Sequence, residues 1–209
     1  NPVAVITSTP GFSHFDAEAI ILAKKEKLKT VSINFSWDNL HNGGMHFRHP
    51  DYLIVWNEII KKTAIKEYGY EESKVFVSGT MRFDSYFHPI PGELSREDFL
   101  NSKKLDPKEK TILITTVTKG NYPDEHLLLG DLLKARDEGK FMGYPNLFVR
   151  MHPKEEFNKF APFLNTTIKN LHVEFPGKFL SKEMGTRIEI QEEDIANLKN
   201  TLKYSDVSI

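Results

Sequence analysis

Three consecutive side chains that could bind a polar ligand follow a strand-like run near the start of the chain. Trp37, Asp38 and Asn39 follow Ser36 and the strand-like run at residues 30–35. In an open parallel sheet, ligands bind outside the carboxyl ends of the strands. At such an end the triplet would offer an aromatic face, a carboxylate and an amide. The alternative is that Trp37 fills a gap in the core and that Asp38-Asn39 only turns the chain.

A second group of candidate residues occurs in the other half, at Arg150-Met151-His152-Pro153. Arg150 carries its charge at every relevant pH, and His152 can donate hydrogen bonds or carry a proton. Both lie where a strand is expected to end and a helix to begin at Pro153, and the free amides of a helix N-terminus favour phosphate. The motif therefore predicts a diphosphate clamp. The alternative is an arginine paired with a nearby acid and a histidine that caps its own helix.

Several other residues are weaker candidates. Thr116 and Lys119 follow another predicted strand, where a hydroxyl and a lysine suit a phosphate or a sugar, although the spacing is not that of a P-loop and a surface turn explains it almost as well. Arg82 lies in a similar turn and could pair with Asp84. His14, at the opening of the first predicted helix, could reach a cleft, although a lone histidine of this kind is more often structural.

The composition excludes several classes of site. The 28 basic residues balance 29 acidic ones, so the chain lacks the basic excess that usually accompanies nucleic-acid binding. The absence of cysteine excludes disulfides, thiolate zinc sites and a cysteine nucleophile. The eight histidines show no metal-ligand spacing, so no metal is expected. No apolar run approaches the ~18 residues that a membrane-spanning helix requires.

These residues must be positioned by alternating strands and helices. Short apolar runs alternate with helical patterns along the whole chain, which predicts βαβ units and parallel sheets in an α/β fold. Strands are expected near residues 3–7, 30–35, 52–56, 74–78, 111–117, 147–151 and 171–175. The pattern changes in a proline-rich stretch, which predicts one domain over residues 1–84, a linker over 85–108 and a second domain over 109–209.

The two ends of the sequence indicate a piece of a longer protein. Asn1 is not an initiator residue, residues 3–6 already read as a buried strand, and residues 206–209 read as a strand that has just begun. Both domains are therefore expected to be incomplete. Exposed apolar surface is expected where further segments would pack.

Five motifs together carry a resemblance to a known family. Their order along the chain resembles that of bacterial surface-polysaccharide glycosyltransferases of the GT-B type, which are similar to the teichoic-acid (CDP-glycerol) glycerophosphotransferases and, more distantly, to the UDP-N-acetylglucosamine 2-epimerase fold. The motifs are Ser36–Leu40, Pro50–Glu58, Gly79–Asp84, Arg150–Pro153 and Tyr204–Val207. The resemblance spans nearly all of the chain. It implies two Rossmann-like lobes with mainly parallel sheets, the nucleotide donor lying mainly on the C-terminal lobe and the acceptor on the N-terminal lobe.

The resemblance also gives residues their expected roles on the donor side. By position, Arg150 and His152 would address the donor phosphates, and Ser205 and Asp206 would open the next donor-binding strand. Thr116 and Lys119 are added to the donor-side candidates on their residue types and position after a strand, not on the resemblance. In this family the chain continues after the Ser-Asp strand with a Ser/Thr-rich loop and a glutamate-bearing helix. These 209 residues by themselves are therefore expected to lack a complete active site.

On the acceptor side, Trp37, Asn39 and Arg82 would line the cleft. Asp38 is the first candidate for the base that takes the proton of the acceptor hydroxyl, and His14 is the second.

The resemblance implies transfer of a sugar or polyol phosphate from a nucleotide-activated donor, such as a nucleotide sugar or a CDP-polyol, to a cell-surface glycan or lipid-linked acceptor. It implies no cofactor. It also implies a cytoplasmic location, either free or peripherally bound to the inner face of the membrane. Two alternatives remain open: a nucleotide-sugar 2-epimerase-like enzyme, and a non-catalytic lobe that binds a glycan or a partner. Sugar interconversion without an acceptor would indicate the epimerase, and absence of nucleotide-sugar binding would indicate the non-catalytic lobe.

Overall fold

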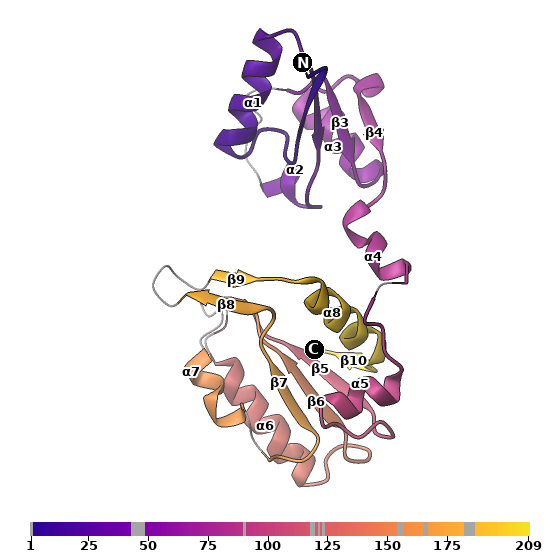
Figure 1. Ribbon diagram of the computed structural model, residues 1–209, viewed down its shortest axis with the longest axis vertical. Helices are drawn as coiled ribbons and strands as arrows, with labels where there is room; N and C mark the ends of the chain where they lie inside the picture. The colour runs from indigo at the N-terminus through magenta and orange to yellow at the C-terminus, as the bar shows by residue number, and fades with distance from the viewer. Residues whose placement is uncertain are drawn as a thin grey trace. The chain divides into compact units, whose positions relative to one another are not determined.

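The chain forms two compact units, the first over Asn1–Phe87 and the second over His88–Ile209 (Figure 1). The computed structural model describes residues 2–42, 49–89, 91–117, 120, 122, 124–153, 157–164, 167–181 and 187–209. Within these ranges, no helix is both long and apolar enough to cross a membrane.

The first unit is a four-stranded parallel sheet in the order β1-β2-β3-β4. Its elements are β1 (Ala4–Thr7), α1 (His14–Lys25), β2 (Lys29–Ile33), α2 (Asn39–Asn42), β3 (Tyr52–Val55), α3 (Glu58–Tyr68), η1 (Glu72–Lys74), β4 (Val75–Val77), η2 (Met81–Phe83) and α4 (Asp84–Phe87).

Local sequence signals set the ends of the two longer helices of this unit. The Ser13 hydroxyl accepts a hydrogen bond from the Asp16 amide at 3.1 Å and opens α1. The Asn57 side chain accepts from the Ile60 amide at 2.9 Å and opens α3. Gly69 ends α3 with φ +71°, a left-handed conformation that glycine adopts without steric strain.

Helices α1, α2 and α3, which connect the strands of the first unit, gather on one face of its sheet. Crossovers between parallel strands are almost always right-handed, so a strand order that runs in one direction sends every connection to the same side. That side holds a buried cluster made of Leu40, Leu53, Val55, Ile60, Ala64, Tyr70 and Val75. On the other face, Ile6 is 68% and Phe76 51% exposed. Apolar side chains of the first unit are thus buried on one face of the sheet and exposed on the other.

The second unit is a four-stranded parallel sheet in the order β10-β5-β6-β7, with a separate antiparallel hairpin β8–β9. Its elements are α5 (Arg96–Ser102), β5 (Thr111–Thr115), α6 (Glu125–Asp137), β6 (Asn146–Arg150), α7 (Phe157–Phe160), η3 (Ala161–Phe163), β7 (Leu171–Glu174), β8 (Lys178–Ser181), β9 (Arg187–Glu189), α8 (Glu192–Tyr204) and β10 (Val207–Ser208).

This second sheet is covered on both faces, with α6 and α7 on one side and α5 and α8 on the other (Figure 1). One core includes Leu129, Leu147, Val149 and Phe160, and the other includes Phe99, Leu100, Leu113 and Phe148. Strand β6 follows β5 in the chain and pairs with one edge of β5. Strand β10, which comes after α8, pairs with the other edge of β5. The carboxyl ends of β5 and β10 therefore flank a topological switch point, the usual ligand-binding position in such sheets.

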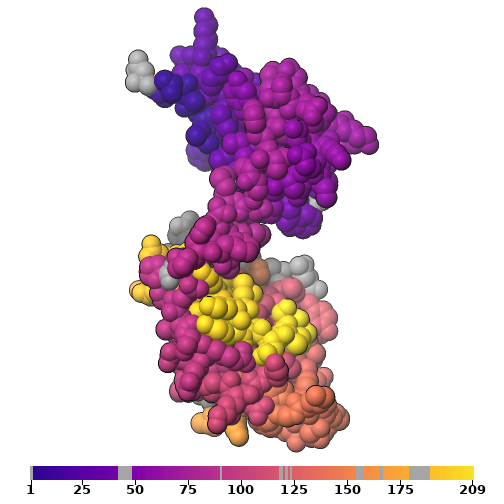
Figure 2. Space-filling model, turned by 90° about the vertical axis from the view of Figure 1, so that its right-hand side faces the viewer, coloured from indigo at the N-terminus to yellow at the C-terminus, as the bar shows by residue number. Residues whose placement is uncertain are grey.

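The predicted fold class is confirmed, because both sheets are parallel and every predicted strand is present within two residues of its expected bounds. The hairpin β8–β9 was not predicted. Most of the stretch predicted as a linker belongs to the second unit. Lys199, Asn200 and Tyr204 of α8 donate hydrogen bonds to the carbonyls of His88, Gly92 and Leu94, respectively. Figure 2 shows α8, in yellow, beside residues of this stretch, in magenta.

Candidate functional site

The carboxyl edge of the first sheet carries the turn at residues 36–40. The Asn34 side chain donates to the Ser36 carbonyl at 2.7 Å, and the Asn39 side chain accepts from the Ser36 amide at 2.8 Å. Tyr68 donates from its hydroxyl to the Leu40 carbonyl at 2.6 Å, and the Leu40 side chain is buried. The turn is therefore fastened to the strand below it and to α3.

Trp37 projects from this turn into solvent, with 64% of the residue exposed. The alternative that it fills a gap in the core is therefore wrong. Asp38 beside it is half-buried, and its carbonyl accepts the His41 amide at 2.8 Å. An exposed indole and a neighbouring carboxylate thus lie together at the edge where ligands bind to parallel sheets.

The other acceptor-side candidates lie on the same edge. His14 is exposed at the first position of α1, which follows β1, the strand next to β2. Arg82 lies after β4, and its guanidinium is 4.9 Å from the centre of the Phe35 ring. Both Arg82 and Phe35 are exposed, so this cation–π contact contributes about 0.5–1 kcal/mol. The Arg82 guanidinium therefore covers one face of the Phe35 ring.

At the carboxyl edge of the second sheet, Thr116 joins the ends of two neighbouring strands. Its amide donates to the Arg150 carbonyl at 3.2 Å, and its hydroxyl accepts from the His152 amide at 2.7 Å. Thr116 is buried, whereas His152 is half-buried. Two of the predicted donor-site residues are thus held side by side beyond β5 and β6. Lys119 lies outside the described residues.

Arg150, predicted as part of a phosphate clamp, is paired with an acidic side chain of the next strand. Its guanidinium forms an ion pair with Glu174, directly opposite it on β7, and the two side chains are only 10% and 11% exposed. The arrangement is therefore the paired arginine that the sequence leaves open as the alternative. The charge of Arg150 is thus balanced by Glu174 inside the second unit.

Glu174 is the centre of a larger polar cluster between the sheet and helices α5 and α8. Lys103 donates to it at 2.8 Å, Asn197 donates at 2.7 Å, and His172 Nε2 lies 3.2 Å away. Burial raises the pKa of Glu174, but the hydrogen bonds from His172 and Lys103 and the charges of Lys103 and Arg150 outweigh it, so the pKa falls to about 2. The carboxylate therefore stays ionised at neutral pH.

The helix expected to begin at Pro153 is described only over Phe157–Phe160, the four residues of α7. Residues 154–156, between Pro153 and this helix, lie outside the described residues. The described residues therefore give no helix N-terminus at Pro153 that would bind phosphate.

Ser205 and Asp206 lie at the opposite edge of the second sheet, which corrects their grouping with the donor site. Ser205 ends α8 and donates from its hydroxyl to the Thr201 carbonyl at 2.6 Å. Asp206 precedes β10 and accepts the amide of Thr111, the first residue of β5, at 2.9 Å. In a parallel sheet these positions form the amino edge, whereas Thr116 is at the carboxyl edge.

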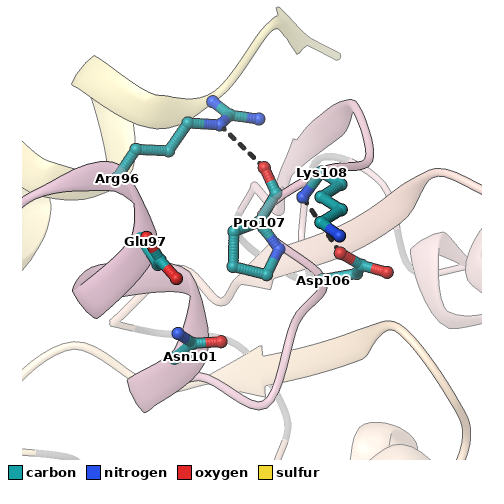
Figure 3. Close-up of a pocket in the computed structure, with 6 residues that line it drawn as sticks. All are labelled: Arg96, Glu97, Asn101, Asp106, Pro107 and Lys108. Atoms are coloured by element: carbon teal, nitrogen blue, oxygen red, sulfur yellow. Dashed lines mark hydrogen bonds between the residues drawn. The ribbon is translucent and has the colours of Figure 1, made fainter.

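Asp206 is bound by two cations at that amino edge. Lys110 Nζ and Arg96 Nη2 lie 2.8 and 3.0 Å from its two oxygens. Burial raises the pKa of Asp206, but the hydrogen bonds from Lys110, the Thr111 amide and Arg96 lower it to about 2. Arg96 also donates to the Pro107 carbonyl at 3.4 Å and borders a pocket of about 350 Å³ (Figure 3). These contacts assign Asp206 a structural role.

Sequence reasoning missed two polar residues beside the candidate sites, Asn34 and Glu174. Asn34 is fully buried, and within the described part of the chain its Oδ1 has no hydrogen-bond partner. A signal for it exists, because Thr30, Ser32 and Asn34 place polar side chains at alternate positions where a buried strand normally has apolar ones. Glu174 has no comparable signal, since only the register of β6 and β7 sets it opposite Arg150.

The described residues contain no group of three or more histidine, aspartate or glutamate side chains that could hold a metal ion. A second pocket, of about 420 Å³, lies between α5 and α8. Lys103 and Asn197 line it, and both also contact Glu174.

Comparison with known proteins gives solved structures of the same fold. S. aureus MnaA in complex with UDP has a TM-score of 0.62 at 14% identity, covering 99% of this chain and 52% of that one. UDP-GlcNAc 2-epimerase from Methanocaldococcus jannaschii has a TM-score of 0.62 at 16% identity, covering 99% and 55%. The Neisseria meningitidis enzyme bound to UDP-GlcNAc has a TM-score of 0.56 at 15% identity, covering 99% and 54%. The chain therefore has the two-lobed, Rossmann-like fold of UDP-GlcNAc 2-epimerases and spans about half their length.

Sequence comparison adds one curated relative. An uncharacterized protein of Methanocaldococcus jannaschii, MJ1060, is 28% identical over 157 residues, which cover 70% of this chain and 25% of that protein. No protein-family model matches the chain.

Proposed function

We propose that this chain carries the nucleotide-binding half of the site of an enzyme that acts on a nucleotide-activated sugar. The observation that carries this proposal is the fold, which matches UDP-GlcNAc 2-epimerases over 99% of the chain, including structures with UDP and UDP-GlcNAc bound. In open α/β sheets the ligand lies beyond the carboxyl ends at the switch point. The nucleotide diphosphate is therefore assigned to the carboxyl edge of the second sheet, at the end of β5, which borders the switch point between β5 and β10, and at the neighbouring end of β6.

At that edge His152 is the proposed contact to the diphosphate, and Thr116 is its positioning residue. Cleavage of a bond to a nucleotide diphosphate develops negative charge on the leaving group, so a hydrogen-bond donor near this charge stabilises the transition state. The Thr116 hydroxyl holds the His152 backbone at 2.7 Å. Arg150 contributes indirectly, because its ion pair with Glu174 fixes the end of β6. A role for Lys119 rests on sequence alone.

Epimerisation of a nucleotide sugar is the reaction class that the fold comparison favours, ahead of the transfer reaction that the motif order suggests. Transfer to a glycan is the second candidate. The exposed Trp37 beside Asp38 favours it, because a transferase needs a surface for a second substrate and a base for its hydroxyl. Asp38 is the proposed base, with His14 as the second candidate.

One assay separates the two reactions. Full-length protein is incubated with UDP-GlcNAc, with and without a glycan acceptor, and products are followed by proton NMR. Interconversion of the sugar without an acceptor supports the epimerase, and release of UDP only in the presence of an acceptor supports the transferase. If neither reaction occurs and UDP does not bind, the proposed function is wrong.

A further inference from the structure

Helix α1 of the first unit packs against the sheet with one side and presents large apolar side chains on the other (Figure 1). Ile20 and Ala23 are buried on the inner side. On the outer side, Phe15 is 88% and Leu22 59% exposed. These two residues are seven positions apart, which is about two turns of helix, so they form one apolar row along the outer side of α1.

A row of two opposite charges runs beside this apolar row. Glu18 and Lys25 are also seven positions apart, and each lies three or four positions from a residue of the apolar row, so the two rows are neighbours on the helix surface. Both residues are exposed, and neither forms an ion pair within the described part of the chain. The other two charged residues of the helix, Asp16 and Lys24, hydrogen-bond within the first unit.

The outer side of α1 differs from the ordinary exposed surface of a protein. A single exposed apolar residue is common and needs no explanation. Here two large apolar residues are aligned on a regular helix, which Ser13 caps at its start and whose inner side is fixed to the sheet. An apolar row flanked by charged side chains is the pattern by which one helix packs on another.

We propose that the outer side of α1 is a self-association surface, on which α1 of a second copy of this chain packs antiparallel about a two-fold axis. In such an interface the same patch of both copies meets itself. Antiparallel packing brings Glu18 of each copy toward Lys25 of the other. Packed helices lie about 8–10 Å apart, a distance that these two side chains span together. Phe15 and Leu22 of both copies are buried between the helices.

The charges of α1 favour a second copy, in the antiparallel direction, over other occupants. A parallel pair would set Glu18 against Glu18 and Lys25 against Lys25, and like charges repel. A uniformly acidic or basic partner would be attracted at one end of the row and repelled at the other. The net charge of the chain is -1, so two copies meet without strong overall repulsion.

The size of the contact sets the expected strength of association. Helix α1 has 12 residues and is therefore about 18 Å long. A pair of such helices buries less than the roughly 800 Å² per partner of a standard interface. We therefore expect a reversible dimer with a dissociation constant of about 1–100 µM.

Sedimentation velocity of the full-length protein, from about 1 to 200 µM, measures this association. The wild type should shift from monomer to dimer over that range. Leu22→Gln, which makes the apolar row polar without adding charge, should raise the dissociation constant about tenfold. Ile59→Gln is the matched control, because Ile59 is 71% exposed on the neighbouring helix α3, and it should leave the dissociation constant unchanged. Circular dichroism confirms that both variants are folded.

Charge reversal tests the antiparallel arrangement itself. Glu18→Lys and Lys25→Glu should each raise the dissociation constant about three- to tenfold, because each change turns two attractive pairs into repulsive ones. The double variant restores both pairs with their signs exchanged, so it should dimerise as the wild type does. A role in the fold of the monomer alone would not produce this recovery.

The inference is overturned if the wild type stays monomeric up to about 200 µM. It is also overturned if Leu22→Gln dimerises as tightly as the wild type, or if the double variant stays as weak as the single ones. A monomer whose α1 peptides are protected in hydrogen exchange would show that another segment of the full-length protein covers the helix.

The inference does not depend on the proposed function, and UDP titration calorimetry on the same samples keeps the two apart. UDP binding by a protein that stays monomeric contradicts only this inference. Dimerisation without UDP binding contradicts only the proposed function.

Discussion

Replacement of Glu174 by glutamine tests how the strand ends of the second unit are held. The carboxylate binds Arg150, Lys103, His172 and Asn197, and its pKa falls from an ordinary 4.5 to about 2 on folding. A carboxyl with that change contributes about 3 kcal/mol to the free energy of unfolding at neutral pH. Glu174→Gln removes this contribution and deprives Arg150 and Lys103, whose side chains are 10% and 18% exposed, of their counterion. The expected loss at pH 7 is therefore about 3 kcal/mol.

The pKa values of Glu174 in the folded and unfolded states also determine how its contribution to the free energy of unfolding depends on pH. Because the folded-state pKa is lowered, the stabilisation is complete above the unfolded-state pKa of about 4.5 and is lost as the pH falls toward 2. The difference between wild type and Glu174→Gln should therefore shrink to about 1 kcal/mol at pH 3.

Urea unfolding followed by circular dichroism at pH 7 and pH 3 measures this difference. Glu138→Gln is the matched control, since Glu138 is an exposed acid whose ion pairs with Lys134 and Lys140 lie at the surface, and its loss should be within about 0.5 kcal/mol. Hydrogen exchange in β6 and β7 peptides locates the effect in the second unit. Equal losses in the two variants, or a Glu174→Gln loss as large at pH 3 as at pH 7, would refute the reasoning.

Three further predictions concern the two edges of the second sheet. Asp206→Asn should lower stability by about 1 kcal/mol at pH 7. The lowered pKa of Asp206 means that this difference should disappear in acid urea titrations; no difference at pH 7 would contradict the structural role. Thr116→Val should weaken UDP binding about tenfold in calorimetry, because it removes the hydroxyl that holds the His152 amide, and an unchanged affinity would contradict that role. Turnover of the full-length protein should survive EDTA, because the proposed site relies on protein groups alone. A loss of turnover in EDTA that added Mg²⁺ restores would contradict this prediction.

Much of the fold could be predicted because its signals are local. The run Leu147–Val149 is continuously apolar, as expected of a strand covered on both faces, and all three residues are fully buried. Asn57 and Gly69 mark the two ends of α3 by capping chemistry that involves only the residues of that helix. Such features depend on neighbours in sequence, so a single sequence contains them.

The candidate site was harder to predict because its contacts depend on register and strand direction. Arg150 and Glu174 are 24 residues apart and meet only because β6 and β7 pair with those residues opposite each other. Asp206 could have been placed correctly from sequence, because a residue that precedes a strand of a parallel sheet lies at the amino edge and not at the ligand-binding edge. Trp37 was open to two interpretations, and only its exposure distinguished them.

The most direct test of the central claim is hydrogen exchange of the full-length protein with and without UDP. Binding at the carboxyl edge of the second sheet should slow exchange in peptides that contain Thr116 and in peptides that contain His152. Peptides that contain Asp206, at the amino edge, should exchange at the same rate in both conditions. Protection confined to the amino edge, or none at saturating UDP, would contradict the assignment of the nucleotide to the ends of β5 and β6.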